Sequence, residues 1–319
     1  MSKLKVGVIG VGSLGQHHAR VYAELPGAQL VGVADADFAR AQEVAARHKA
    51  KAYADYLQLL PEIQAASIVV PTSMHHVVAR DCLGAGVHIL VEKPIAAGLA
   101  EAEGMVALAA GRGLALQVGH IERVNPAVRA AAAHIADPRF VECTRIAPFV
   151  ARGTDVPVVL DLMIHDIDII LSFVRAELER VSAIGFALVS DTEDIANARL
   201  EFQNGCVANV TASRISVKKE RKIRFFQRNA YVNVDCLKPE AKIYRLKGKP
   251  KGVLDLAKMV DYQELRIDRT EPLKAELDAF VDCVLTGTEP VVTGTDGLRA
   301  LRVAAQILEG IAKHTQKLS

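Results

Sequence analysis

The first part of the chain alternates short apolar runs with longer segments of helical period. Five of these runs predict strands, at Lys5–Ile9, Gln29–Ala34, Ser67–Val70, His88–Val91 and Ala115–Val118. Alanine-rich stretches between them, such as Phe38–His48 and Leu99–Gly111, predict helices. This alternation is typical of a parallel, doubly wound sheet with right-handed crossovers. Because such sheets bind ligands outside the carboxyl ends of their strands, the residues that follow each strand are candidates for a site.

From about Phe140 the pattern changes to period two. Apolar and polar residues alternate in the segments RFVECTRI, ARLEF, CVANVTAS, KIRFF and YVNVDC, which predicts a mostly antiparallel sheet. Asn204-Gly205 stands between two of these segments and is a strong hairpin signal. Helices are expected over Pro157–Val174, Pro272–Leu285 and Gly297–Lys313. The change of pattern predicts two domains, residues 1–120 and residues 121–319.

Composition narrows the class of protein. A chain of 319 residues is longer than a domain built on one hydrophobic core usually is, which agrees with two domains. No apolar stretch reaches the roughly 18–20 residues of a membrane span, so we expect no membrane segment and no signal peptide. The net charge of +2 is too small to indicate a nucleic-acid partner. The five cysteines lack CxxC spacing and indicate a reduced, cytoplasmic protein.

A glycine-rich turn, GVGSLG, directly follows the first predicted strand. Gly10 permits a tight turn, Gly12 lets the backbone approach a pyrophosphate, and Gly15 lets the next helix pack on the strand. Ser13 and Leu14 complete this loop, and the start of the helix favours phosphate charge. The pattern predicts a dinucleotide-binding loop; the alternative is a glycine-rich turn in an ordinary α/β protein.

An acidic residue, Asp35, ends the next apolar run twenty positions after Gly15. This spacing suits a carboxylate that binds the adenosine ribose hydroxyls of a dinucleotide. No arginine stands immediately beside Asp35 in the sequence to receive a 2′-phosphate. The pattern therefore favours NAD over NADP.

The run VEKP places Glu92, Lys93 and Pro94 directly after another apolar strand. Lys93 is therefore expected to project toward the cofactor crevice. Partial desolvation beside a positively charged nicotinamide would lower the pKa of a lysine toward the range that suits proton transfer. The alternative is a surface lysine.

Asp161 and His165 stand four residues apart in a helical pattern, and Asp168 follows three residues later, so the three share one helix face. His165 suits a general acid or base for a hydroxyl, and Asp161 could orient it or hold that hydroxyl. The alternative is a hydrogen-bonded histidine in an interface helix. Asp166 points to a different face, so no metal site is expected.

Together these motifs resemble the Gfo/Idh/MocA family, which includes glucose-fructose oxidoreductase and inositol dehydrogenase. The resemblance covers essentially the whole chain and is carried by GVGSLG, PTSMHH, VEKP and the DxxxHxxD pattern. It implies an α/β protein, with an N-terminal Rossmann-like doubly wound parallel sheet followed by an α+β domain. The second domain would have an open-faced, mostly antiparallel sheet that commonly forms homodimers or homotetramers. The resemblance also implies that Lys93, Asp161 and His165 form the catalytic group, and that the bond before Pro94 is cis in many relatives.

Longer stretches look like a branch of that family similar to UDP-N-acetylglucosamine 3-dehydrogenases. They are GHIERVNPAV, PFVARGTDVPVVLDLMIHDIDI and DIANARLEFQNGCVANVTASR. A nucleotide-sugar diphosphate needs donors, and Arg123, Arg152 and Arg214 are candidates, each with a structural ion pair as the alternative. Asn125 and Asp168 are further candidate substrate residues, although capping the next helix is the ordinary role for Asn125. Pro157–Val159 replace glycines often found before the catalytic helix, which departs from the pattern of small polyol pockets.

The activity that the resemblance implies is reversible hydride transfer between NAD and a secondary sugar hydroxyl, at C3 of a nucleotide sugar such as UDP-N-acetylglucosamine. Thr72, His75 and Glu92 would line the cofactor, with a helix-start role as the alternative for His75. Lys93 and His165 would share the hydroxyl proton. The alternatives are an inositol or simple sugar dehydrogenase, a redox-neutral enzyme that uses NAD transiently, and a non-catalytic NAD-binding sensor or assembly subunit.

Overall fold

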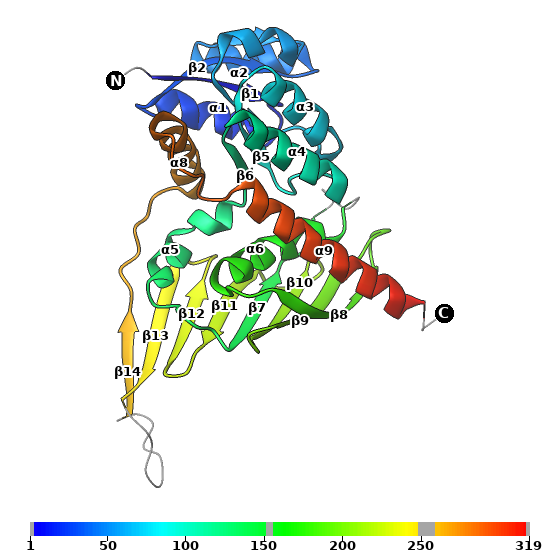
Figure 1. Cartoon of the computed structure of the whole chain (residues 1–319), viewed down its shortest axis with the longest axis vertical. Helices are drawn as coiled ribbons and strands as arrows, with labels where there is room; N and C mark the ends of the chain where they lie inside the picture. The colour runs from blue at the N-terminus through cyan, green and yellow to red at the C-terminus, as the bar shows by residue number, and fades with distance from the viewer. Residues whose placement is uncertain (1–2, 151–155, 248–258, 317–319) are drawn as a thin grey trace. The chain divides into compact units, whose positions relative to one another are not determined.

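The computed structural model describes residues 3–150, 156–247 and 259–316 (Figure 1). The chain forms two compact units. The first unit comprises Met1–Ile121 and Thr270–Arg299, and the second comprises Glu122–Arg269 and Ala300–Ser319. The first boundary lies beside the position expected from the sequence. The expectation of a continuous second domain is not met, because Thr270–Arg299 returns to the first unit.

The first unit contains a sheet of six parallel strands. They are β1 (Leu4–Ile9), β2 (Ala28–Ala34), β3 (Lys51–Tyr53), β4 (Ala65–Ile68), β5 (His88–Glu92) and β6 (Leu116–Gly119). Their order, β3-β2-β1-β4-β5-β6, reverses direction between β1 and β4. The parallel, doubly wound sheet is therefore confirmed, and the reversal is where such sheets bind ligands. The sequence pattern missed β3, whose three residues are too few to show a period.

Five helices pack in this unit: α1 (Gly15–Glu24), α2 (Phe38–His48), α3 (Thr72–Gly84), α4 (Leu99–Arg112) and α8 (Pro272–Thr286). Helix α1 contacts α2 and α8, whereas α3 contacts α4. Leu277 and Phe280 of α8 are fully buried in the same core as Val21 and Tyr22 of α1. This apolar contact is the physical reason why the late segment belongs to the first unit.

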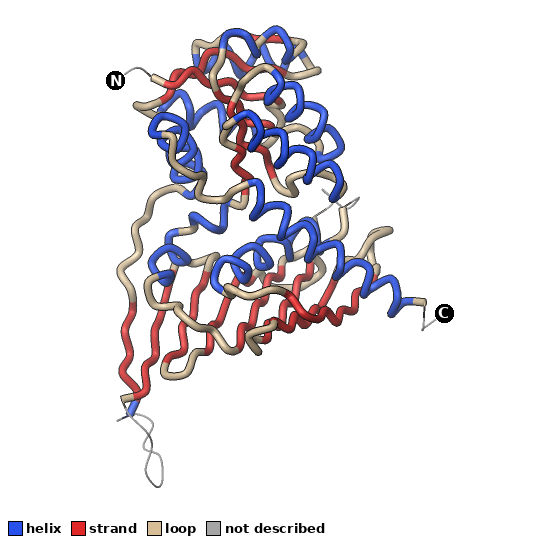
Figure 2. The backbone as a smooth tube through the Cα atoms, viewed as in Figure 1, coloured by secondary structure: helices blue, strands red, loops and turns tan. Residues whose placement is uncertain are grey.

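The second unit contains an eight-stranded sheet (Figure 2). Its strands are β7 (Phe140–Ile146), β8 (Leu178–Phe186), β9 (Ile195–Phe202), β10 (Val207–Ser213), β11 (Glu220–Phe226), β12 (Ala230–Asp235), β13 (Glu240–Leu246) and β14 (Val260–Glu264). The order is β14-β13-β12-β11-β7-β10-β9-β8. Among these described strands only β7 and β10 pair in parallel, so the mostly antiparallel sheet is confirmed. Gly205, at φ +79°, makes the predicted turn between β9 and β10.

Helices cover one face of this sheet. Helix α5 (Pro126–Ala132) contacts β12 and β13, and α6 (Ile164–Phe173) contacts β7 and β10. The last helix, α9 (Gly294–Thr315), packs Gly310 and Ile311 against β8. On β7, Val141, Cys143 and Arg145 are buried toward the helices, while the alternate residues are partly exposed. We call the side formed by these alternate residues the open face.

Candidate dinucleotide and catalytic site

A cavity of about 630 Å³ lies at the carboxyl ends of β1, β2 and β4 in the first unit. Its polar wall comes from the residues after β2, and its apolar wall from those after β4. The lining includes Gly10, Gly12, Asp35, Arg40, Tyr56, Val70, Pro71 and Met74. This is the switch point of the strand order, where an α/β sheet takes its ligand.

The glycine-rich loop has the local geometry that the sequence predicted. Gly10 has φ +86°, and a Cβ added there would meet the Val69 carbonyl oxygen at 2.5 Å. A Cβ on Gly15 would lie 1.9 Å from the Gly10 carbonyl oxygen, so α1 can start only with a glycine at that position. A Cβ on Gly12 would meet no atom within 4 Å, which leaves that backbone open beside the cavity. Ser13 and Leu14 are exposed in the same loop.

The N-terminus of α1 suits an anion. Within the part of the chain that the structure describes, no side chain caps this helix and its first turn holds no acidic residue. The first amides of a helix lack internal acceptors and carry a partial positive charge. The open glycine backbone and this helix end therefore fit the pyrophosphate of a dinucleotide.

The Asp35 carboxylate is held firmly at the end of β2. It accepts the Val11 amide at 2.8 Å and the Asp37 amide at 2.9 Å. Burial works against its charge, but Arg40 and these amides more than offset burial and hold the pKa of the Asp35 carboxyl below its usual range. An ionised acceptor at this position fits the ribose hydroxyls.

The prediction from the sequence missed Arg40. Its position corrects the statement that no arginine stands beside Asp35. Its Nη2 lies 2.8 Å from Asp35 Oδ1 and its Nε 3.2 Å from Asp35 Oδ2. An arginine does therefore stand beside Asp35, five residues later in the sequence and in the first turn of α2. Asp35 precedes α2 and lies five residues from Arg40, which is not a helical i,i+3 or i,i+4 spacing, so the sequence carries no simple signal for this pair.

His75 is a buried link between two loops. Its Nδ1 lies 2.9 Å from the Pro94 carbonyl oxygen and its Nε2 3.0 Å from the Val70 carbonyl oxygen. Burial lowers the pKa of His75, so the neutral ring is favoured and one nitrogen donates. The ring joins the segment after β4 to the segment after β5, where the Lys93–Pro94 bond is cis. Thr72, which starts α3, and Lys93 are both partly exposed.

Glu92 is also surrounded by protein atoms. Its Oε1 lies 3.2 Å from Nε2 of His18, a fully buried residue of α1. A Cβ on Gly119 would come within 2.9 Å of the same carboxylate, so a larger residue there would displace the Glu92 side chain. Glu92 thus connects α1, β5 and β6 directly beside Lys93. His18 was missed by the sequence-based prediction and lies on the buried face of the helix after the glycine loop.

In the second unit the expected helix over Pro157–Val174 is made of two parts. A π-helical turn covers Val159–Met163 and α6 follows it. The Ile164 amide donates to the Val159 carbonyl oxygen, five residues back. Turns of this kind are frequent at functional sites, and this one contains Asp161. His165 stands in the first turn of α6, and both side chains are partly exposed.

Asp168 and Arg123 form an ion pair with two hydrogen bonds. Arg123 Nε and Nη2 lie 2.9 and 2.6 Å from the two Asp168 oxygens. Asn125 accepts the Ala127 amide at 3.0 Å, so it caps α5. Its amide group also donates to Glu122 at 2.9 Å. These contacts are those of the structural alternatives considered for Arg123 and Asn125.

Helix α6 also takes part in a second cluster, around the buried Arg145. Its guanidinium donates to both Asp166 oxygens, at 3.0 and 2.8 Å, and to Glu122 at 2.8 Å. Arg221 reaches the same Glu122 oxygen at 3.1 Å. Burial works against the charge on Glu122, but Arg145 and Arg221 outweigh it and hold the pKa of Glu122 below its usual range. The cluster joins α6, β7 and β11.

Arg214 has a comparable role at the start of the helical segment. Its Nη2 donates to the carbonyl oxygens of Val156 at 2.7 Å and Glu193 at 2.9 Å. Its Nε lies 3.1 Å from Asp194 Oδ1. These are again the contacts of a structural ion-pair partner. Arg152, the third candidate arginine, lies outside the described residues.

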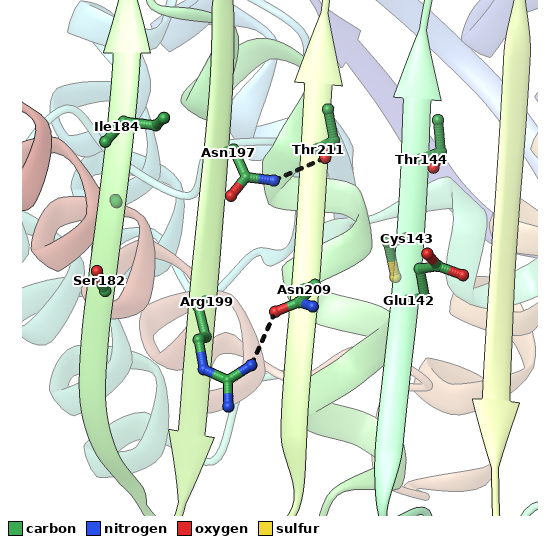
Figure 3. A pocket seen from close by; sticks show the side chains of 10 residues that line it. Glu142, Cys143, Thr144, Ser182, Ile184, Asn197, Arg199, Asn209 and Thr211 are labelled. Carbon is green, nitrogen blue, oxygen red and sulfur yellow. Dashed lines mark hydrogen bonds between the residues drawn. The ribbon is translucent and has the colours of Figure 1, made fainter.

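The open face of the second sheet carries a shallow hollow of about 530 Å³ (Figure 3). Polar side chains from neighbouring strands point into it, among them Asn197, Arg199, Asn209 and Thr211. Asn197 donates to Thr211 at 2.8 Å, and Arg199 to Asn209 at 3.5 Å. A row of aromatic rings crosses the same face, with centroids 4.8–5.6 Å apart, at Phe140, Phe226, Tyr231, Tyr244 and Tyr262.

The parallel sheet, the glycine loop at its switch point and the fixed carboxylate after β2 define a dinucleotide-binding protein of the Rossmann type. Residues 4–120 match the Gfo/Idh/MocA oxidoreductase family with its NAD-binding Rossmann fold, and residues 127–232 match the Gfo/Idh/MocA C-terminal domain. The chain belongs to this family, so the resemblance inferred from its motifs is confirmed.

Relatives of the chain include a nucleotide-sugar dehydrogenase and inositol dehydrogenases. The chain is 37% identical to UDP-N-acetylglucosamine 3-dehydrogenase of Acidithiobacillus ferrooxidans, over 99% of this chain and 100% of that protein. A solved structure of that enzyme, GnnA, has a TM-score of 0.90 at 38% identity and covers 98% of each chain. The scyllo-inositol 2-dehydrogenase (NAD(+)) of Bacillus subtilis is 29% identical over 94% of this chain and 92% of that protein. The chain is thus a member of an oxidoreductase family, and no helix in its described residues is both long and apolar enough to cross a bilayer.

Proposed function

We propose that this protein is an NAD-dependent dehydrogenase that oxidises the C3 hydroxyl of a UDP-linked N-acetylamino sugar. The observation that carries the proposal is identity of 37% along the full length of a UDP-N-acetylglucosamine 3-dehydrogenase. The residues Lys93, Asp161 and His165 supply the acid–base groups that such a reaction needs. The scyllo-inositol dehydrogenase at 29% identity makes an inositol or simple sugar dehydrogenase the second candidate.

The glycine loop and the start of α1 would hold the dinucleotide, with Asp35 on the adenosine ribose. Bound NAD supplies the hydride acceptor. Lys93 and His165 would remove and return the proton of the sugar hydroxyl, and Asp161 would orient one of them or hold the hydroxyl. Glu92 and His75 would act by fixing the segment on which Lys93 stands, since both are engaged with protein atoms.

We infer that NAD is preferred over NADP, because Asp35 is an ionised acceptor fixed by two backbone amides. A 2′-phosphate would meet that charge. Arg40 supplies a guanidinium that could compensate, so the preference depends on whether Asp35 keeps Arg40 engaged. Turnover measured with NAD and with NADP in the native enzyme and in Asp35→Ala tests this, and the variant should lose most of its preference for NAD.

The first experiment is NADH formation with a panel of UDP-N-acetylglucosamine, UDP-glucose, free N-acetylglucosamine, myo-inositol and glucose. An aminotransferase that consumes a ketosugar keeps an unfavourable equilibrium from hiding turnover. Turnover confined to UDP-N-acetylglucosamine supports the proposal. Turnover on free polyols selects the second candidate, and NAD binding without turnover on any substrate would favour the sensor.

Replacement of Lys93 tests the acid–base role. Lys93→Ala should lower kcat by about 10²–10⁴, the range for loss of one such group, while the Kd for NAD stays nearly unchanged. Lys274→Ala, at an exposed position of α8 in the same unit, is the matched control and should leave kcat unchanged. Native turnover in Lys93→Ala would remove Lys93 from the mechanism.

We further propose a cytoplasmic homodimer or homotetramer joined through the open face. Its aromatic row includes Phe226 and Tyr262, which are 36% and 50% exposed. Exposed aromatic side chains in a contiguous row are typical of protein interfaces. The cytoplasmic location is supported by five cysteines that are all buried and in no disulfide, and by the nucleotide substrates that we propose.

A further inference from the structure

Three arginine–aspartate pairs, each with a buried carboxylate, hold the segment that carries Asp161 and His165. They are Arg123–Asp168, Arg145–Asp166 and Arg214–Asp194. We propose that these pairs, the positioning frame, set the orientation of the two candidate catalytic side chains. The three arginines then act on the reaction through the protein and are positioning residues. This inference rests on the proposed function.

Two of the pairs, Arg145–Asp166 and Arg123–Asp168, hold α6 at residues that lie on either side of His165 around the helix axis. Asp166 is one residue beyond His165, about 100° around the helix axis, and Asp168 is about 60° around in the opposite sense. Each aspartate receives two hydrogen bonds from one arginine, of 2.6–3.0 Å. A rotation of α6 that moved His165 would therefore break planar, two-bonded contacts on both sides. Such forked pairs fix angle as well as distance.

The third pair fixes the start of the segment. Arg214 binds the Val156 carbonyl oxygen, and the Val158 amide donates to the Glu193 carbonyl oxygen at 3.0 Å. Asp194 accepts the amides of the turn before it, at 2.6–3.0 Å. The π-helical turn with Asp161 thus runs between one anchored end at Val156 and a second at Asp166.

The donors of these arginines are already directed at protein acceptors. Arg145 uses Nε, Nη1 and Nη2 on Asp166 and Glu122, and its side chain is 3% exposed. Arg123 is 15% exposed and places Nε and Nη2 on Asp168, itself 1% exposed. A substrate diphosphate would have to compete with a buried carboxylate for each of these arginines. The geometry therefore favours positioning over substrate binding.

The test uses Arg123, since it is the least buried of the three arginines. Arg123→Lys keeps the charge and loses the fork, and Arg123→Met loses both. We expect kcat to fall about 10-fold in the lysine variant and about 100-fold in the methionine variant, with the KM for NAD within 2-fold of native. Amide hydrogen exchange of Ile164–Phe173 should become faster in both, without substrate present. Arg139→Lys, in the exposed pair with Asp137, is the matched control and should change neither quantity.

The outcomes separate the possible roles. A higher KM for the nucleotide sugar with native exchange in α6 would show that Arg123 is a substrate ligand and would overturn the inference. Native kcat and native exchange in a folded Arg123→Lys protein would overturn it as well. If Arg123→Met does not fold, kcat and amide exchange measured in Arg123→Lys and Asp168→Asn test the inference instead. Should the native enzyme not turn over nucleotide sugars, the proposed function fails, while the exchange measurement still tests the frame.

Discussion

At the scale of single residues, Asp194 shows how a buried charge can stabilise a turn. Its carboxylate accepts the amides of Leu188, Val189 and Ser190 and the Ser190 hydroxyl at 2.6 Å. Burial works against the charge, but these donors outweigh it and hold the pKa of Asp194 well below its usual range. The ionised form is therefore bound more strongly in the folded protein than in the unfolded chain.

This predicts an acid-dependent effect of Asp194→Asn. A depressed carboxyl pKa contributes stability that is complete above the unfolded pKa of about 3.9 and is lost as the pH falls further. We expect the variant to be less stable than native by about 2 kcal/mol at pH 7, and the difference to shrink below about pH 4. Urea unfolding at a series of pH values measures it. A difference that stayed constant down to pH 3 would mean that the charge plays no part.

The sequence predicts candidate site residues where the motif is local. The loop Gly10–Gly15 and Asp35 are set by distances along a single βαβ unit. Arg40 and His18 were missed because their partners, Asp35 before α2 and Glu92 at the end of β5, are brought to them by the packing of helix against strand, which adjacent positions do not reveal. The partners of Arg123 and Arg214, 45 residues away at Asp168 and 20 residues away at Asp194, come from tertiary packing and are not encoded in any spacing.

At the scale of secondary structure, α8 is held to the first unit by its apolar face. Leu277 and Phe280 are fully buried, whereas Leu285 on the same helix is 44% exposed. Leu277→Ala should lower the free energy of unfolding by about 2–5 kcal/mol, from lost burial and the cavity left behind. Leu285→Ala is the matched control and should cost under about 1 kcal/mol. Chemical denaturation with the NAD site empty gives both values, and equal losses would contradict this assignment of the helix.

Elements with a clear period were predicted, and short or weakly patterned ones were not. The strands β9 and β10 follow the alternation in ARLEF and CVANVTAS, with the turn at Asn204-Gly205 between them. Strand β14, Val260–Glu264, has one apolar and four polar or aromatic residues and shows no alternation. The π-helical turn was read as ordinary helix, because one extra residue per turn changes the apolar pattern too little to detect.

At the scale of the whole molecule, the open face predicts self-association. Phe226→Lys would put a charge in the aromatic row at a position that is already 36% exposed, so the protomer should stay folded. We expect the mass in solution to fall toward the 34.4 kDa of one chain. Sedimentation measures this mass. Leu57→Lys, at a position of the first unit that is 50% exposed, is the control and should leave the mass unchanged.

If a folded Phe226→Lys protein kept the native mass, the interface would have to lie outside the aromatic row. A native protein that already sediments as one chain would remove the proposed oligomer altogether. Far-UV circular dichroism of each variant separates loss of assembly from loss of fold.

The return of Thr270–Arg299 to the first unit has a consequence for biosynthesis. The ribosome completes all six strands of the parallel sheet before it makes α8, and residues 120–271, nearly half of the chain, are translated in between. During that interval Val21 and Tyr22 lack the side chains of Leu277 and Phe280 that cover them in the finished protein. The nascent first unit is therefore expected to stay incompletely packed, and accessible to chaperones, until α8 has been translated.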